Sequence, residues 1–88
     1  MKSTWHVYLV ECADKTLYTG ITTDLKRRIG EHNDSLKGAR YTRAKRPVKL
    51  VYSEAAVSRS EASKREYELK KLPRFEKLVL IQGYTVPI

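Results

Sequence analysis

Two tyrosines and a glycine near the start of the chain have types and spacing that could serve a site. Tyr8 and Tyr18 lie ten residues apart, and Gly20 follows the second tyrosine inside the same predicted strand. Tyrosine suits strands in general, so the pair alone has a purely structural explanation. A glycine inside a strand weakens it and often marks a close approach of backbone or ligand. The pattern leaves both interpretations open.

Arg28 and His32 form a second candidate pair. They are four residues apart and would share one face of a predicted helix. Leu25 and Ile29 flank them on the stripe that should face the core. A cation beside such a stripe either extends to solvent at its edge or points into a polar site, and the sequence favours neither.

Glu66 is the third candidate. Ala62 lies four residues before it and Leu69 three residues after it, which places its carboxylate on the apolar face of a predicted helix. An inward carboxylate needs a cation, and a metal ion or Arg28 would supply one. The alternative is a surface ion pair with Lys70, at the favourable spacing of four residues.

The charge of the chain points toward a polyanionic partner. Eighteen Lys and Arg residues against ten Asp and Glu give a net charge of +8. Between residues 35 and 53 there are six cations and no acid, namely Lys37, Arg40, Arg43, Lys45, Arg46 and Lys49. If this segment forms one surface, it would contact phosphates, and Tyr41 within it could stack on bases. A solubilising surface loop is the alternative.

Length and composition set the frame for these residues. The 88 residues suffice for one domain, which we expect to span 1–88. The single cysteine, Cys12, excludes an intramolecular disulfide and fits a reducing compartment. The sequence shows neither the apolar run of a secretory signal nor one long enough to cross a membrane. We therefore expect a cytoplasmic protein without a membrane partner.

The elements that must position these residues follow from periodicity and capping. Strands are predicted over 4–12 and 17–22, joined as a hairpin, and a third over 47–52. A helix capped by Thr23 or Asp24 should cover 24–33, with Leu25, Ile29 and Leu36 on one stripe. A capping box at Ser58 opens a helix to about residue 72, and a last helix covers 74–82 before Gly83. The order β-β-α-β-α-α predicts an α+β fold.

The hairpin carries a geometric condition for a shared site. Tyr8 and Tyr18 lie on one face of the sheet only if residues paired across the hairpin have an even sum. A two-residue turn at Asp14 and Lys15 would give an odd sum and put the tyrosines on opposite faces. We therefore predict a loop of odd length, for example 14–16, or a bulge.

In order and spacing these residues resemble the GIY-YIG endonuclease domain. The resemblance rests on Val7-Tyr8-Leu9, Tyr18-Thr19-Gly20, Thr23, Arg28, His32 and Glu66, over about three-quarters of the chain. A small stand-alone bacterial branch of the family shows similar stretches at 18–22, 39–42 and 46–48. The two motifs that give the family its name keep only their tyrosines and one glycine. These departures leave the proposed chemistry untouched.

The resemblance implies a three-stranded antiparallel sheet with the first strand central, flanked by three helices. It also implies roles for the matching residues. Tyr8 would be a base or orient the attacking water, and Tyr18 would support the site by hydrogen bonding. Gly20 would let the backbone approach the substrate. Arg28 would meet the scissile phosphate, His32 would assist proton transfer or phosphate contact, and Glu66 would bind the metal.

The function implied is hydrolysis of a phosphodiester with one divalent ion, Mg²⁺ or Mn²⁺. DNA is a more expected substrate than RNA, in structured or single-stranded form, in repair or recombination. Tyrosine is a poor base unless nearby cations lower its pKa, which Arg28 and a metal would do. Endonucleases of this class usually carry an additional specificity domain, so we expect restricted cutting or a protein partner. The alternative is a binding module without catalysis.

Overall fold

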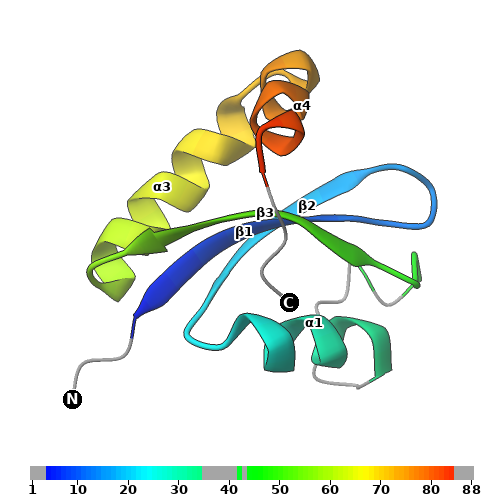
Figure 1. The fold of residues 1–88 in the computed structure, drawn as a ribbon, viewed down its shortest axis with the longest axis horizontal. Coiled ribbons are helices and arrows are strands. Elements are labelled where there is room, and N and C mark those ends of the chain that lie inside the picture. The colour runs from blue at the N-terminus through cyan, green and yellow to red at the C-terminus, as the bar shows by residue number, and fades with distance from the viewer. Residues whose placement is uncertain (1–3, 35–41, 43, 85–88) are drawn as a thin grey trace.

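The computed structural model describes residues 4–34, 42 and 44–84 of the chain. Its described elements are β1 (Trp5–Glu11), β2 (Leu17–Thr22), α1 (Leu25–Asp34), β3 (Lys49–Ala56), α3 (Arg59–Lys71) and α4 (Arg74–Gln82). The strands are antiparallel in the order β2-β1-β3, so the first strand is central (Figure 1). The predicted α+β fold and element order are confirmed.

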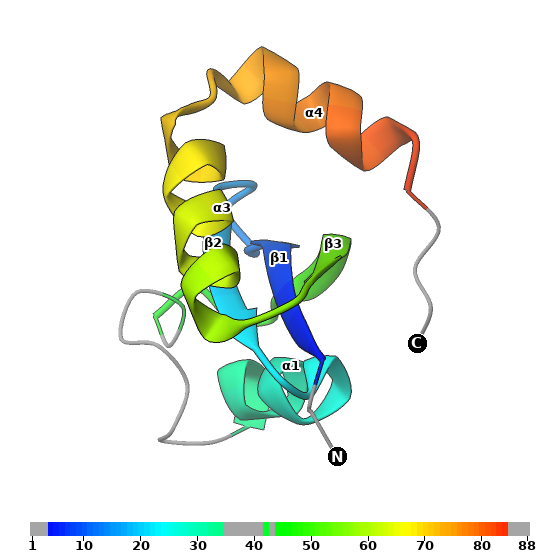
Figure 2. The same ribbon diagram turned by 90° about the vertical axis from the view of Figure 1, so that its left-hand side faces the viewer.

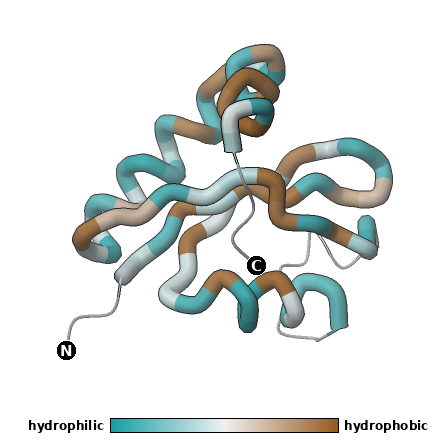
Figure 3. Tube along the Cα trace, viewed as in Figure 1, coloured by the Kyte–Doolittle hydropathy of each residue, from teal (hydrophilic) through white to brown (hydrophobic). Residues whose placement is uncertain are grey.

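Helices cover both faces of this sheet. Figures 1 and 2 show α1 on one side and α3 with α4 on the other. Hydrophobic residues run along the strands between these layers (Figure 3). On the α1 side, Tyr8 and Val10 pack with Leu50, while on the α3 side Val7 packs with Leu69. Because consecutive residues of β1 point to opposite faces, it serves both cores.

The hairpin satisfies the condition for a shared face. Tyr8 pairs with Gly20 and Val10 pairs with Tyr18 across the two strands. Both pairs have even sums, so the two tyrosines and Gly20 lie on the α1 side. The prediction of a loop with odd length is confirmed.

The loop itself lies one residue earlier than the predicted example of 14–16. The Cys12 amide donates to the Thr16 carbonyl at 2.8 Å, and the Lys15 amide donates to the Cys12 carbonyl at 2.9 Å. The connection is therefore the three residues 13–15. Its last residue, Lys15, has a φ of 72°, the left-handed conformation that closes three-residue hairpin loops.

The third strand differs from its prediction. It runs over Lys49–Ala56 rather than 47–52. Ser53, Glu54 and the two alanines have low strand propensity, but pairing with β1 as far as Trp5 overrides it. A register shift between Leu9 and Val10 accompanies this pairing. The strand also anchors α3, because Glu54 accepts hydrogen bonds from Tyr52 at 2.6 Å and from Arg65.

The helix ends follow their capping residues. The Asp24 carboxylate accepts from the Arg27 amide at 3.0 Å, which identifies Asp24 rather than Thr23 as the cap of α1. The Ser58 hydroxyl accepts from the Glu61 amide at 3.2 Å and opens α3. Helix α4 follows Pro73 and ends at Gly83. Leu36, expected on the inward stripe of α1, lies outside the described residues.

Candidate active site

The Tyr8 phenol lies across the backbone of the neighbouring strand at Gly20. A Cβ atom placed on Gly20 would come within 2.4 Å of the Tyr8 hydroxyl oxygen and 2.6 Å of the ring carbon that carries it. Both distances are shorter than any ordinary contact, so only glycine leaves room for the ring here. The role of Gly20 that the structure describes is thus to admit Tyr8. Its contact with substrate stays a prediction.

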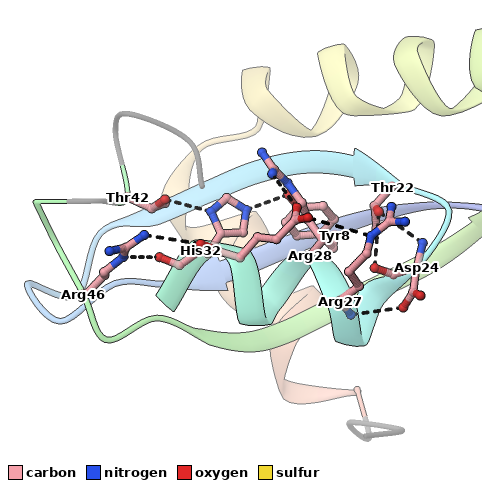
Figure 4. A network of polar contacts seen from close by, with 9 residues as sticks. Tyr8, Thr22, Asp24, Arg27, Arg28, His32, Thr42 and Arg46 are labelled. Carbon is pink, nitrogen blue, oxygen red and sulfur yellow. Dashed lines mark hydrogen bonds and ion pairs between the residues drawn. The ribbon is translucent and has the colours of Figure 1, made fainter. Parts of the chain in front are cut away.

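A buried chain of hydrogen bonds connects the sheet to α1 through this phenol. The Tyr8 hydroxyl lies 2.8 Å from His32 Nε2, and His32 Nδ1 lies 2.7 Å from the Thr42 hydroxyl (Figure 4). Tyr8 is 1% exposed, and His32 and Thr42 are 0% exposed. Buried polar groups without partners are costly, so this chain fixes the orientation of both rings.

Burial also keeps His32 neutral. Loss of solvation, with a further contribution from the charge of Arg28, lowers the pKa of His32 from 6.5 to about 4. A neutral imidazole has one donor and one acceptor nitrogen. With the proton on Nδ1, the ring donates to Thr42 and its Nε2 accepts from Tyr8. In that tautomer His32 is ready to receive the phenolic proton.

The same burial overturns one expectation about Tyr8. Nearby cations were predicted to lower the pKa of its phenol. Burial instead raises the pKa of Tyr8 to about 12, and a hydrogen bond from Arg28 and its charge only partly oppose this. The desolvation cost of a buried phenolate therefore exceeds the attraction of one guanidinium. A stable tyrosinate is not the resting form of this residue.

Arg28 lies at the edge of this cluster. Its guanidinium donates to the Glu31 carboxylate at 2.9 Å, and its side chain is 24% exposed. Burial works against its charge, but hydrogen bonds to Glu31 and Tyr8 outweigh that effect and raise the pKa of Arg28. The Arg28 side chain is thus partly exposed, while its guanidinium also bonds the Tyr8 phenol.

Tyr18 joins the cluster through ring packing. Its ring centroid lies 5.5 Å from that of His32 at an interplanar angle of 67°, an edge-to-face contact. Tyr8 meets the same imidazole edge-on at 5.8 Å and 65°. The structure thus brings together four of the predicted catalytic residues, from β1, β2 and α1.

Glu66 is placed differently. It belongs to α3, whose buried Ala62 and Leu69 pack on the opposite face of the sheet from Tyr8. Its carboxylate is 24% exposed and lies 3.5 Å from Lys70 Nζ. The surface pair considered from the sequence therefore exists, and the side chain is half-buried as well. Its negative charge is one of the smaller causes that raise the pKa of Tyr8, so the two residues lie within electrostatic range.

Among the described residues, the single carboxylate of Glu66 fits a weakly held divalent ion and not a metal site whose ligands are all protein side chains. Within the described residues, no group of three or more His, Cys, Asp or Glu side chains could hold a metal. Mg²⁺ is often held by one or two carboxylates, with water and substrate phosphates completing its shell. Glu66 could supply such a single carboxylate. The metal itself stays a prediction.

The basic segment is only partly described. Lys37, Arg40, Tyr41 and Arg43 lie outside the described residues. Lys45 bonds the Asp14 carboxylate at 2.6 Å, and with Thr16 it holds the pKa of Asp14 well below its ordinary value. Arg46 donates to the carbonyls of Glu31 and His32 at the end of α1, a favourable place for a cation. These contacts position the segment, and its binding of nucleic acid stays a prediction.

Thr42 and Asn33 are site-supporting residues that the sequence analysis did not single out. Thr42 completes the buried chain described above. The Asn33 side chain pairs with the Val48 backbone in both directions, at 2.9 and 2.7 Å, and thereby ties α1 to the segment before β3. The only signal for Thr42 was its place in the 39–42 stretch shared with the family branch. Nothing in the local pattern marked Asn33.

Comparison with known proteins decides the family. The sequence model of the GIY-YIG catalytic domain matches residues 4–78. The chain belongs to the GIY-YIG nuclease family. The resemblance seen in the sequence is thereby confirmed, and the substrate class that this GIY-YIG domain implies is nucleic acid. Within the described residues, no helix is long and apolar enough to cross a membrane.

The chain is also similar to several UPF0213 proteins. A UPF0213 protein of Desulfotalea psychrophila is 62% identical over 79 residues, which is 90% of this chain and 72% of that protein. One of Syntrophus aciditrophicus is 52% identical over 77 residues, 88% of each chain. The solution structure of a UPF0213 protein from Bacillus halodurans matches with a TM-score of 0.58 and 45% identity, covering 96% of this chain and 88% of that one.

Proposed function

We propose that this GIY-YIG domain hydrolyses phosphodiester bonds in DNA, using Tyr8, Arg28, His32 and Glu66. The observation that carries the proposal is the buried chain from Tyr8 through His32 to Thr42, beside the Arg28 guanidinium. Packing alone does not require a neutral imidazole aligned on a phenol. Such a pair is suited to moving a proton.

In this proposal the phenol transfers protons without becoming a free phenolate. Its pKa of about 12 makes the ionised form costly. The attacking water gives a proton to the Tyr8 oxygen while the phenolic proton passes to His32 Nε2, 2.8 Å away. Arg28 donates to the Tyr8 oxygen, which favours donation of the phenolic proton to Nε2, and the Thr42 hydroxyl can then accept from Nδ1. The positive charge then resides on His32, where the negative charge of the neighbouring Glu31 stabilises it.

Arg28 and Glu66 act on the negative charge that develops on the phosphoryl oxygens. Arg28 turns from Glu31 toward a phosphoryl oxygen and stabilises the negative charge that builds there. Glu66 would hold Mg²⁺ or Mn²⁺, and when bound that ion would neutralise further charge on the phosphate oxygens. Tyr18 keeps the His32 ring in place through its edge-to-face contact.

Metal-dependent cleavage tests the proposal. Labelled duplex, single-stranded, flapped and branched DNA, and RNA, are incubated with Mg²⁺ or Mn²⁺ and either the wild type or Glu66→Gln. The control is Glu68→Gln, the same change on the same helix at a carboxylate that is 63% exposed and pairs with Arg65. We expect cutting that requires metal, disappears in Glu66→Gln and persists in Glu68→Gln. Cutting that survives in Glu66→Gln would remove this residue from the site.

A binding module without catalysis is the second candidate. It is favoured by the ion pairs that engage Arg28 and Glu66 within the protein, with Glu31 and Lys70 respectively. Arg28→Ala separates the two functions. A nuclease loses cutting while other cations retain most of its affinity for DNA. Salt-sensitive binding by a wild type that cuts none of the substrates would establish the module instead.

A further inference from the structure

The solvent side of α3 carries an aromatic ring among ammonium groups. Lys64, Tyr67, Lys70 and Lys71 are spaced three, four and seven residues apart and share one side of this helix. We call these four residues the α3 outer face. Tyr67 is 61% exposed, although Ala62 and Leu69 of the same helix are buried. Packing of the core therefore does not explain a large aromatic side chain at this position.

One cation of this face lies directly against the ring. Lys71 Nζ lies 4.2 Å from the centroid of the Tyr67 ring. This contact steadies the ring and can contribute up to about 1 kcal/mol at an exposed site. One ammonium group covers one face of a ring, so the other face is where a flat partner could stack. The pair thus presents a π surface with a positive charge directly beside it.

Phosphates would compete easily for the remaining cations. Lys64 is paired with Glu61 at 3.8 Å and Lys70 with Glu66 at 3.5 Å, and their side chains are 73% and 53% exposed. Exposed ion pairs of this length contribute about 0–1 kcal/mol. A phosphate that approaches Lys70 would also release the Glu66 carboxylate. The α3 outer face thus adjoins the proposed metal ligand, because Lys70 pairs with Glu66 and Tyr67 follows Glu66 in the helix.

We propose that the α3 outer face binds a single-stranded stretch of nucleic acid next to the cleaved phosphate, with one base stacked on Tyr67. Stacking requires an exposed base, which a single strand offers and an intact duplex does not. The proposal deepens the function proposed above, on which it rests for nucleic acid as the ligand and for Glu66 as the residue that marks the cleaved phosphate. It assigns the substrate class as DNA or RNA with a single-stranded segment.

Binding without cleavage tests this assignment. Fluorescence anisotropy of a labelled thymidine oligonucleotide is measured in EDTA with wild type, Tyr67→Ala, Tyr67→Phe and the control Phe75→Ala. Phe75 provides the control because it is also an exposed aromatic residue, at 75%, but lies on α4 and outside the α3 outer face. Stacking on one base contributes about 1–3 kcal/mol, so Tyr67→Ala should weaken binding about 5- to 150-fold. Tyr67→Phe and Phe75→Ala should bind within about twofold of the wild type.

The same set of variants is then tested with duplex DNA and at several salt concentrations. Tyr67→Ala should change duplex binding less than twofold. Replacing Lys64 and Lys71 by Gln should lower the salt slope for the single strand by about 1.4. Wild-type affinity in Tyr67→Ala, or an equal loss in Phe75→Ala, would overturn the proposal. A wild type that binds in this manner but never cuts would instead overturn only the nuclease function.

Discussion

The Tyr8 hydroxyl contacts the His32 ring, lies beside Arg28 and rests over Gly20. Tyr8→Phe removes this one oxygen and keeps the ring. We expect cleavage to fall about 10²- to 10⁴-fold, since the proton acceptor is lost. Leaving His32 Nε2 buried without a partner should also cost about 1–3 kcal/mol of the free energy of unfolding. Single-turnover cleavage and urea unfolding measure the two effects.

Tyr52→Phe is the matched control for that change. It removes a hydroxyl that bonds Glu54 at 2.6 Å, on the side of the sheet that faces α3. It should affect stability but leave the cleavage rate within about threefold of the wild type. If Tyr8→Phe cleaved as fast as Tyr52→Phe, the phenol would have no part in the chemistry.

The neutral state of His32 predicts how stability depends on pH. Its pKa is about 4 in the folded protein and 6.5 ordinarily, so between these values the unfolded chain binds more protons. Stability is therefore fully present above about pH 6.5 and falls as the pH drops toward 4. For this fully buried ring, we expect a loss of about 1–3 kcal/mol. Urea unfolding between pH 4 and 7.5 measures it.

The contribution of Asp14 falls in a different pH range. Hydrogen bonds from Lys45 and Thr16 lower the pKa of this carboxyl below its ordinary 3.8. Its stabilising effect is thus lost only as the pH falls below about 4.

A free energy of unfolding that stayed constant from pH 6.5 to 4.5 would contradict a buried neutral His32. Direct titration of the His32 ring by NMR provides the independent check.

Strands β1 and β2 depend on a close approach of the Tyr8 ring to the backbone at Gly20. In Gly20→Ala the new methyl group would overlap the Tyr8 hydroxyl and ring. We expect displacement of the phenol, a loss of about 1–3 kcal/mol in stability and a marked fall in cleavage. Gly30→Ala in α1 is the control, because among the described residues its added Cβ meets nothing within 4 Å. That change should raise stability by up to about 1 kcal/mol. Thermal unfolding of both variants decides, and equal behaviour would contradict the packing described here.

Features that depend on neighbouring residues in the chain were predictable from the sequence. The cap at Ser58 and the end of α4 at Gly83 follow from local sequence signals. The odd length of the hairpin loop follows instead from the condition that Tyr8 and Tyr18 share one face of the sheet. The family resemblance named Tyr8, Tyr18, Arg28 and His32, which the structure brings close together.

Features that depend on packing between distant segments were not predictable. The last four residues of β3 are strand only because β1 lies beside them. Thr42 joins the site from a segment that is ten residues away from His32 in sequence. The raised pKa of Tyr8 arises from the amount of protein around it, which no local pattern reports. Arg28 lowers this pKa as expected, but burial, which the sequence analysis did not weigh, outweighs it.

The charge of the whole molecule governs its affinity for nucleic acid. With a net charge of +8, binding should release counterions from the phosphate backbone. If four phosphates are contacted, raising NaCl from 50 to 200 mM should weaken duplex binding about 10²-fold. Anisotropy titrations at several salt concentrations measure the slope. Unfolding measured at both concentrations provides the control that the protein stays folded, and a flat salt dependence would exclude phosphate contact as the source of affinity.

Cys12 can serve as a probe of local unfolding. It is the only cysteine of the chain, and it is 2% exposed within the cluster that contains Tyr8 and Val10. A thiol reagent can react fully with it only in molecules in which the packing around Cys12 has opened, so the labelling rate under native conditions reports how often this happens. Any site variant can thus be compared with the wild type by its labelling half-life. A change in cleavage that leaves this half-life unaltered then belongs to chemistry, and one that shortens it belongs to folding.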